Sequence, residues 1–198
     1  MIKGVSGVPG AGKTYFVVKE IADKYYTFDK QFSEWIKKEK YKEILIITNI
    51  NQFKLASISI TDYMEKHNFQ SYEDIFSVDY WQKIVDDNPD LQVIFLIDEA
   101  QKYFPSNYRN NDVFYFFQYH RHLGIDIYLT YQSWSSISRK ITDLMEFEIR
   151  AVRQTFKIGS EFRYHFFAGL DKIGSTLRKS DKMIFALYQS FDSTQEGT

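Results

Sequence analysis

Eight residues near the N-terminus have the spacing of a loop that binds phosphate groups. The segment Gly7-Val8-Pro9-Gly10-Ala11-Gly12-Lys13-Thr14 fits the pattern G-x-x-x-x-G-K-[ST], between a short apolar run and a helical pattern. Its glycines allow backbone conformations that are closed to residues with a Cβ atom, so successive N–H groups can point at phosphate oxygens. The start of the following helix adds the positive end of its dipole. The segment is therefore predicted to bind a triphosphate.

The residue types of this loop predict separate roles. The lysine is expected to reach the β- and γ-phosphates and to support catalysis, and the threonine hydroxyl to hold Mg²⁺. A glycine-rich turn that caps a helix and binds nothing is the alternative. The residues predicted to bind ATP are Gly7, Gly10, Ala11, Gly12, Lys13 and Thr14.

A second motif joins a buried strand to two acids. Five consecutive apolar residues, 93–97, are typical of a parallel strand that is buried on both faces, and Asp98 and Glu99 follow it directly. Ligands of open α/β sheets bind outside the carboxyl ends of the strands. Asp98 is therefore expected to hold Mg²⁺, and Glu99 to orient and deprotonate the attacking water. Alternatively, the two acids only cap the next helix.

A glutamine is predicted to sense the γ-phosphate. Residues 125–131 form another apolar strand, and Gln132 follows it. Nucleotide hydrolases often place a polar residue at the end of the strand beside the one that carries the acids. A helix-capping or loop glutamine is the alternative.

Composition sets limits on the function. The chain has 198 residues, 44% of them hydrophobic, a formal net charge of −1 and no cysteine. No overall field therefore draws it to nucleic acid, and disulfide or thiolate chemistry is excluded. No apolar run reaches the roughly 18–20 residues that span a bilayer. We expect a soluble chain with one ATPase domain at 1–191 and a polar tail or linker at 192–198.

The pattern of the chain predicts an α/β fold of the P-loop NTPase class, with a mostly parallel sheet flanked by helices and an antiparallel β extension near the C-terminus. Parallel strands are expected at 1–6, 43–49, 92–98 and 125–131. Helices are expected at 13–27, 110–122 and 135–145, with two short ones within 60–88 and another at 29–40. The extension is expected as a hairpin of 147–157 and 161–168 around Gly159 and Ser160, with a last strand at 182–191.

Together these segments resemble the zonula occludens toxin family, which includes the assembly ATPase of filamentous phages and belongs to the FtsK/HerA-like motor ATPases. The resemblance covers about residues 1–155. It is carried by the phosphate-binding loop, the string LIDEAQKYFP (96–105), the string HRHLGIDIYLTYQ (120–132) and the strand end Thr48-Asn49-Ile50. The family strand more often ends in Thr-Gln, whereas Tyr131 precedes Gln132 here.

The resemblance implies an ATP-hydrolysing motor that drives assembly and extrusion of filamentous virions, or DNA translocation, at the cytoplasmic face of the host inner membrane. Implied partners are further copies in a ring such as a hexamer, phage assembly or coat proteins, and single-stranded DNA. Family members usually add a transmembrane helix, and that segment is not in this sequence. In such rings a neighbouring subunit supplies a catalytic arginine. Arg139 is the first choice, followed by Arg121, Arg150 and Arg153.

Other functions stay open. A nucleotide-gated interaction module would bind ATP and turn over slowly, and a small-molecule or nucleoside kinase would need an arginine-rich lid that the sequence lacks. A GTPase is disfavoured because Gln101 stands where that class has glycine. The predicted hairpin could bind DNA, or it could simply be amphipathic. The basic residues in question are Arg150, Arg153, Lys157 and Arg163, and the aromatic ones Phe147, Phe156, Phe162 and Tyr164.

Overall fold

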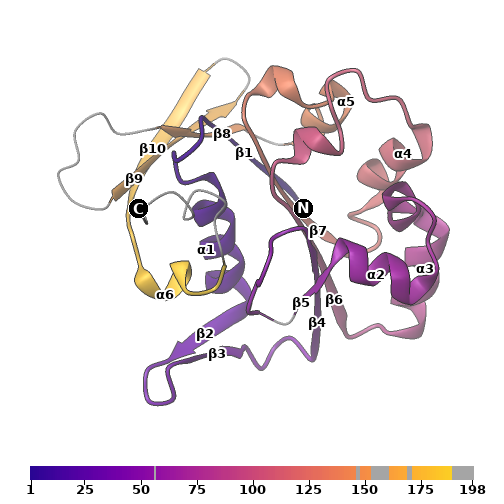
Figure 1. Ribbon diagram of the computed structural model, residues 1–198, viewed down its shortest axis with the longest axis horizontal. Helices are drawn as coiled ribbons and strands as arrows, with labels where there is room; N and C mark the ends of the chain where they lie inside the picture. The colour runs from indigo at the N-terminus through magenta and orange to yellow at the C-terminus, as the bar shows by residue number, and fades with distance from the viewer. Residues whose placement is uncertain (56, 146–147, 153–160, 169–170, 189–198) are drawn as a thin grey trace, which may run out of the picture.

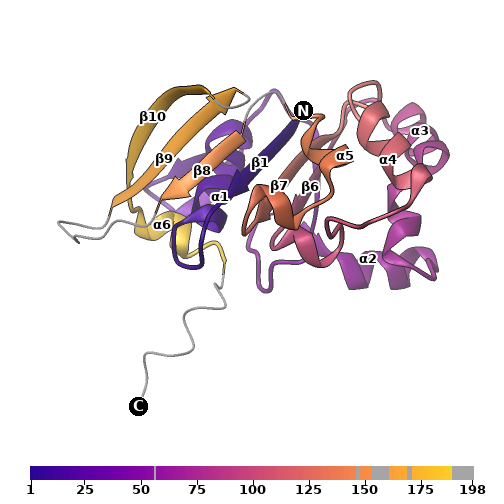
Figure 2. The same cartoon turned by 90° about the horizontal axis from the view of Figure 1, so that it is seen from above.

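The computed structural model describes residues 1–198 except 56, 146–147, 153–160, 169–170 and 189–198. Its main sheet has eight strands: β1 (Ile2–Ser6), β4 (Glu43–Thr48), β5 (Ser57–Ser59), β6 (Leu91–Ile97), β7 (Asp126–Tyr131), β8 (Glu148–Val152), β9 (Glu161–Ala168) and β10 (Asp171–Lys179). Their order is β10-β9-β8-β1-β7-β6-β4-β5, of which Figure 2 shows the part from β10 to β6. All pairs from β8 to β5 are parallel, whereas β9 and β10 add antiparallel pairs.

Helices cover both faces of the sheet, with α1 and α6 on one side and α2 to α5 on the other (Figure 1). They are α1 (Lys13–Tyr25), α2 (Ile60–His67), α3 (Val78–Asp87), α4 (Asn111–Tyr119), α5 (Arg139–Thr142) and α6 (Lys182–Phe185). Short 3₁₀ turns are η1 (Tyr72–Phe76), η2 (Ala100–Lys102) and η3 (Trp134–Ser136). Among the described residues, no helix is both long and apolar enough to cross a membrane.

The continuous apolar run at 93–97 is explained by the position of β6 between two layers of helices. Val93, Phe95 and Ile97 enter the core beneath α2–α4. Ile94 and Leu96 enter the core beneath α1. Successive side chains of a strand point to opposite faces, so a strand with helices on both sides must be apolar throughout.

The predicted fold class is confirmed, as are the four parallel strands, the helix at 110–122 and the two short helices within 60–88. The pairing of β8 with β9 is antiparallel, as expected. The predicted turn at Gly159 and Ser160 lies outside the described residues, as does the tail at 192–198.

Two expectations for helices were wrong. Residues 29–40 form no helix, because β2 (Tyr26–Asp29) and β3 (Glu34–Lys37) make a hairpin in which Phe28 packs edge-on against Trp35. The helix at 135–145 is reduced to η3 and α5. Serine hydroxyls there bond to nearby backbone, as Ser136 Oγ does to the Ser133 carbonyl at 2.6 Å, and such bonds compete with a helix.

The C-terminal part also differs from the prediction. The strand predicted at 182–191 was wrong for its described residues, 182–188. The short helix α6 begins there after Asp181, whose carboxylate caps it by accepting from the Met183 N–H at 2.9 Å. The strand β10 was not predicted. It alternates exposed and half-buried residues at the sheet edge, so it has no apolar run to mark it.

A buried carboxylate fixes the start of β7 to neighbouring elements. Asp126 accepts hydrogen bonds from the Met1 α-amino group at 2.9 Å, from Lys24 Nζ at 2.5 Å and from the Tyr25 hydroxyl. Burial alone would favour the neutral acid, but these hydrogen bonds outweigh it and lower the pKa of Asp126. The ionised form therefore stabilises the fold.

We expect Asp126→Asn to lower the free energy of unfolding at neutral pH by about 2 kcal/mol, because the two amines lose their charged partner. The loss stays modest because solvent screens these partly exposed amines. A carboxylate with a lowered pKa stabilises the fold above its unfolded pKa of about 3.9, and this contribution is lost as pH falls through the folded pKa. Urea unfolding should therefore show the two proteins converging in acid. Asp171→Asn, at an exposed position, is the control. An equal deficit at every pH would contradict this account.

Candidate functional site

Four segments meet at the carboxyl edge of the sheet. Gly7 follows β1, Gln132 follows β7, Asp98 follows β6 and Asn49 follows β4. These strands are consecutive neighbours and all run parallel. The residue after each strand therefore emerges at the same edge. The chain brings together positions more than 120 residues apart in this way.

The glycine-rich loop leads from β1 into α1. The Gly7 N–H lies 3.2 Å from the carbonyl oxygens of both Tyr131 and Gln132, which ties the loop to the end of β7. Gly12 has φ of 89°, and a Cβ atom built on it would lie 2.4 Å from Phe162 Cδ1. Both the backbone conformation and the contact with β9 therefore require glycine at position 12.

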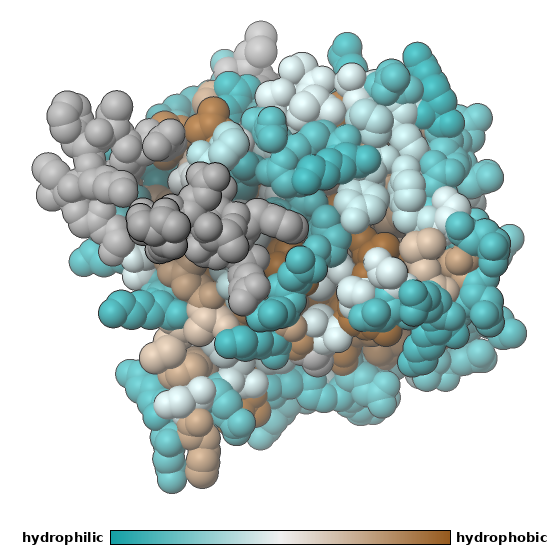
Figure 3. Space-filling model, viewed as in Figure 1, coloured by the Kyte–Doolittle hydropathy of each residue, from teal (hydrophilic) through white to brown (hydrophobic). Residues whose placement is uncertain are grey.

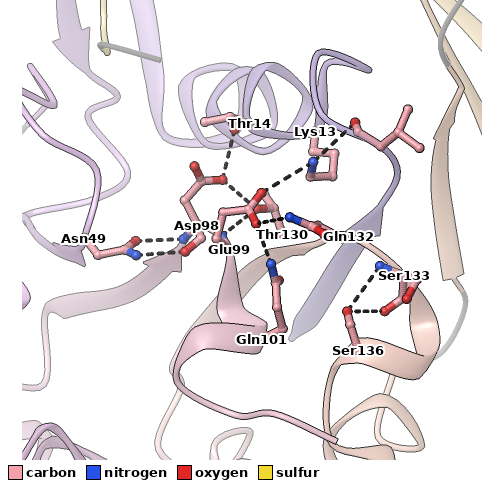
Figure 4. A network of polar contacts seen from close by, with 11 residues as sticks. Lys13, Thr14, Asn49, Asp98, Glu99, Gln101, Thr130, Gln132, Ser133 and Ser136 are labelled. Atoms are coloured by element: carbon pink, nitrogen blue, oxygen red, sulfur yellow. Dashed lines mark hydrogen bonds and ion pairs between the residues drawn. The ribbon is translucent and has the colours of Figure 1, made fainter. Parts of the chain in front are cut away.

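Asp98 is held by two hydroxyl groups and one amide. Thr14 Oγ1 and Thr130 Oγ1 donate to Asp98 Oδ1 at 2.9 and 2.5 Å (Figure 4). The Asn49 side chain bonds to both backbone groups of Asp98, at 2.7 and 2.8 Å. The carboxylate of Asp98 therefore points at the first turn of α1, where Thr14 lies.

Burial raises the pKa of Asp98, the two hydroxyl donors lower it, and the charge of Glu99 raises it further, with a net increase. A divalent cation at this carboxylate would favour its ionised form. The hydroxyl and carboxylate oxygens of Thr14 and Asp98 are ligands that Mg²⁺ prefers. These two residues could therefore hold a magnesium ion between the loop and β6.

Glu99 turns back toward the phosphate-binding loop. Its φ of 51° is in the left-handed region, and its N–H donates to Thr130 Oγ1 at 3.0 Å. Its carboxylate lies 3.5 Å from Lys13 Nζ and accepts from Gln132 Nε2 at 3.2 Å and from Gln101 Nε2. Figure 4 shows these side chains converging on the carboxylate. The site thus places a potential base beside a lysine and a glutamine.

A pocket of about 380 Å³ contains this constellation. It is lined by Pro9, Gly10, Gly12, Lys13, Thr14, Tyr15, Asp98, Glu99, Lys102, Gln132, Phe162, Phe185 and Tyr188. Two larger hollows, of about 640 and 420 Å³, are lined by residues 26–91 and 73–115 and include no residue of the loop. We assign the site to the smaller pocket because the convergent polar groups lie there.

Sequence reasoning missed several residues of the site. Thr130 bridges Asp98 and Glu99, Asn49 fixes the backbone of Asp98, and Gln101 binds the Glu99 carboxylate. Asn49 follows a predicted strand at the same edge, and that position could have identified it. No sequence pattern identifies Gln101 or Thr130 as a donor to the acids. Their roles depend on how the chain turns after β6 and on which residues of β7 face the acids.

The three described arginine candidates, Arg121, Arg139 and Arg150, do not line this pocket. Arg139 is 88% exposed and lies 3.5 Å from Asp143. Arg150 pairs with Glu148 at 2.6 Å and stacks over the Phe167 ring. Arg121 lies in the exposed turn after α4, and Arg153 is outside the described residues. The exposure of Arg139 leaves it available to another molecule.

Of the aromatic residues that could stack on DNA or belong to an amphipathic hairpin, the two that are described fit the second alternative. Tyr164 is fully buried, and its hydroxyl donates to the Gly12 carbonyl at 2.8 Å. Phe162 lines the pocket and packs on Tyr15 with ring centroids 4.8 Å apart. The ring of Tyr164 is buried against α1, and the half-buried ring of Phe162 lies between α1 and the pocket. Phe147, Phe156 and Lys157 lie outside the described residues.

Comparison with solved structures shows the same fold. The N-terminal domain of zonular occludens toxin from Neisseria meningitidis aligns with a TM-score of 0.66 and 20% identity, over 95% of this chain and 98% of that one. The genome packaging NTPase B204 from Sulfolobus turreted icosahedral virus 2, in complex with ATP-gammaS, gives a TM-score of 0.52 and 13% identity, over 90% and 96%. Its complex with AMPPCP gives 0.53 and 14%, over 91% and 97%.

No curated protein matches the chain at a significant level. The family model described as zonular occludens toxin (Zot) matches residues 1–196, which is nearly the whole sequence. The fold, the glycine-rich loop and the acidic strand end agree with that match. The chain therefore belongs to the Zot family, with the fold of P-loop NTPases.

Proposed function

We propose that the protein hydrolyses ATP by Mg²⁺-assisted attack of water and uses the free energy to drive a viral assembly motor. One observation carries the proposal: the loop and the acidic strand end, 84 residues apart in sequence, meet at the Thr14–Asp98 contact of 2.9 Å. Beside it, Lys13 Nζ lies 3.5 Å from Glu99 Oε1. A P-loop facing two acids is the arrangement that hydrolysis of a triphosphate requires.

In this mechanism the loop N–H groups and Lys13 bind the phosphates, and Thr14 and Asp98 hold the metal. Bound Mg²⁺ would neutralise charge on the β- and γ-phosphate oxygens. A triphosphate would compete with Glu99 for the ammonium group of Lys13. The Glu99 carboxylate, 3.5 Å away, is then released to orient and deprotonate water, while Gln132 contacts the γ-phosphate.

Family membership and the fold of the viral packaging NTPase support a role in virus assembly. We propose a homo-oligomeric ring, such as a hexamer, in which Arg139 of one subunit reaches the pocket of the next. It would act at the host inner membrane, together with phage assembly or coat proteins and single-stranded DNA, to extrude filamentous virions.

A nucleotide-gated interaction module with slow turnover is the second candidate. One observation favours it: the Glu99 carboxylate is bound by Lys13, Gln132 and Gln101 together. A base held by three donors accepts a proton from water poorly. Turnover by the isolated protein would then be slow until a partner changes these contacts.

Two substitutions separate binding from hydrolysis. Lys13→Ala removes the cation that binds the phosphates, and we expect it to abolish detectable ATP binding. Glu99→Gln keeps the shape of the side chain but cannot accept the proton, so ATP should bind while kcat falls by about 10² or more. Calorimetry and phosphate release measure the two effects. Lys19→Ala, on an outer face of α1, is the control. Turnover of Glu99→Gln near that of the parent protein would reject Glu99 as the base.

Thr130→Val tests the hydroxyl that bridges the two acids. Its bond lowers the pKa of Asp98, so losing it should raise that pKa further and reduce the ionised fraction in mild acid. We expect half-maximal ATPase activity to need several-fold more Mg²⁺ below neutral pH, with the difference shrinking as pH rises. Thr142→Val, which removes a buried hydroxyl bound to the Arg139 carbonyl, is the matched control. Unchanged Mg²⁺ dependence would show that Thr130 does not act through Asp98.

Mixing subunits tests Arg139. Arg139→Ala keeps the P-loop pocket, and Lys13→Ala keeps the arginine, so each should be inactive alone. If the arginine acts on the neighbouring subunit, an equimolar mixture should regain part of the ATPase activity. Lys140→Ala, at the neighbouring position, is the control and should hydrolyse ATP without being mixed with a second variant. Full activity of Arg139→Ala alone, or no recovery on mixing, would refute the assignment.

A further inference from the structure

Aromatic side chains form the apolar part of the pocket. Phe162, Phe185 and Tyr188, here called the aromatic wall, line it together with Lys13 and Thr14. They come from β9, from the end of α6 and from the residues that follow it. None of the phosphate or metal roles proposed above uses these rings.

The aromatic wall is fixed to the turn of α1 that follows the loop. Tyr15, next to Thr14, is buried with its ring centroid 4.8 Å from that of Phe162 and 5.0 Å from that of Phe185. Phe162 also lies against Gly12. Any movement of the wall relative to the loop would disrupt these contacts, so the two sides of the pocket form one preorganised surface.

One ring of the wall remains open. Phe185 is 40% exposed, whereas Tyr188 is buried beside it with centroids 6.1 Å apart. In Figure 3, light brown hydrophobic atoms lie over α6 on this side of the molecule. A flat apolar ligand could cover the exposed face of Phe185 while remaining connected to the loop.

We propose that the aromatic wall is the nucleobase subsite, and that the base of a bound nucleoside triphosphate stacks on Phe185. The proposal rests on the function above, because the triphosphate held by the loop tethers the base. Stacking of bases on aromatic side chains stabilises binding and tolerates any base, because every base has a π-face. The pocket volume of about 380 Å³ falls in the range of sites for small ligands.

The hydroxyl of Tyr15, whose ring packs on the wall, already has two backbone partners. The Tyr15 hydroxyl donates to the Lys179 carbonyl at 2.9 Å and accepts from the Asp181 N–H at 3.0 Å. Burial, followed by the charge of Asp98, raises the pKa of Tyr188, so this phenol lies near the acidic end of the site. We expect stacking on Phe185, which does not depend on the identity of the base, to dominate the contribution of the base to affinity. ATP and GTP should bind within about threefold of each other.

Calorimetric titration with two probes tests this subsite. Mg²⁺–AMPPNP carries a base, and Mg²⁺–tripolyphosphate carries only the phosphates. We expect Phe185→Ala to weaken AMPPNP binding about tenfold and to change tripolyphosphate binding less than about twofold. Phe185→Trp should keep or improve AMPPNP affinity. The fluorescence of this variant should change when AMPPNP is added and stay the same when tripolyphosphate is added. Met183→Ala is the matched control, because Met183 is 45% exposed on the same helix but does not line the pocket.

Each other outcome has a distinct meaning. Parent-like AMPPNP affinity in Phe185→Ala, or equal loss of both probes, would overturn the nucleobase subsite while leaving the phosphate site intact. Equal affinity of the parent protein for the two probes would overturn it as well. If the parent protein binds neither probe, the proposed nucleotide site itself fails, and the subsite fails with it.

Discussion

A carboxylate at the edge of a buried strand loses hydration, and this structure compensates Asp98 with donors from two other segments. Thr14 comes from the start of α1 and Thr130 from β7, so the bonds to one carboxylate connect the loop, β6 and β7. An unpaired charge there would be costly. The geometry of the whole site, including the approach of Glu99 to Lys13, depends on this arrangement.

The C-terminal extension contributes to the site as well as to the sheet. Strand β9 places Phe162 against Gly12 and lets the Tyr164 hydroxyl bond to the Gly12 carbonyl. A side chain at position 12 would push β9 away, and a shift of β9 would free the loop. The antiparallel strands thereby help to fix the conformation that exposes the loop N–H groups. Loop and extension are one structural unit, although about 150 residues separate them.

The sequence allowed the centre of the site to be located because its members follow strands with clear apolar runs. Lys13, Thr14, Asp98, Glu99 and Gln132 line one pocket at this edge of the sheet, and their roles there stay predictions. Thr130 was missed because it lies within a strand, where a threonine ordinarily indicates only β propensity. Phe162 was assigned to a possible DNA surface, because alternation identifies two faces of a strand without telling which one is covered.

The sequence was sufficient for the fold class, for four of the parallel strands and for the prediction that the loop and the acids lie at one edge of the sheet. The periodicity of apolar residues and the spacing of glycines are local properties of the chain, so they can be recognised without knowledge of distant contacts. Three features could be seen only in the folded structure: β10 forms the sheet edge, residues 182–185 are helical, and Thr130 bonds to both acids. These features depend on contacts between distant segments, and the free energy of such contacts exceeds weak local preferences.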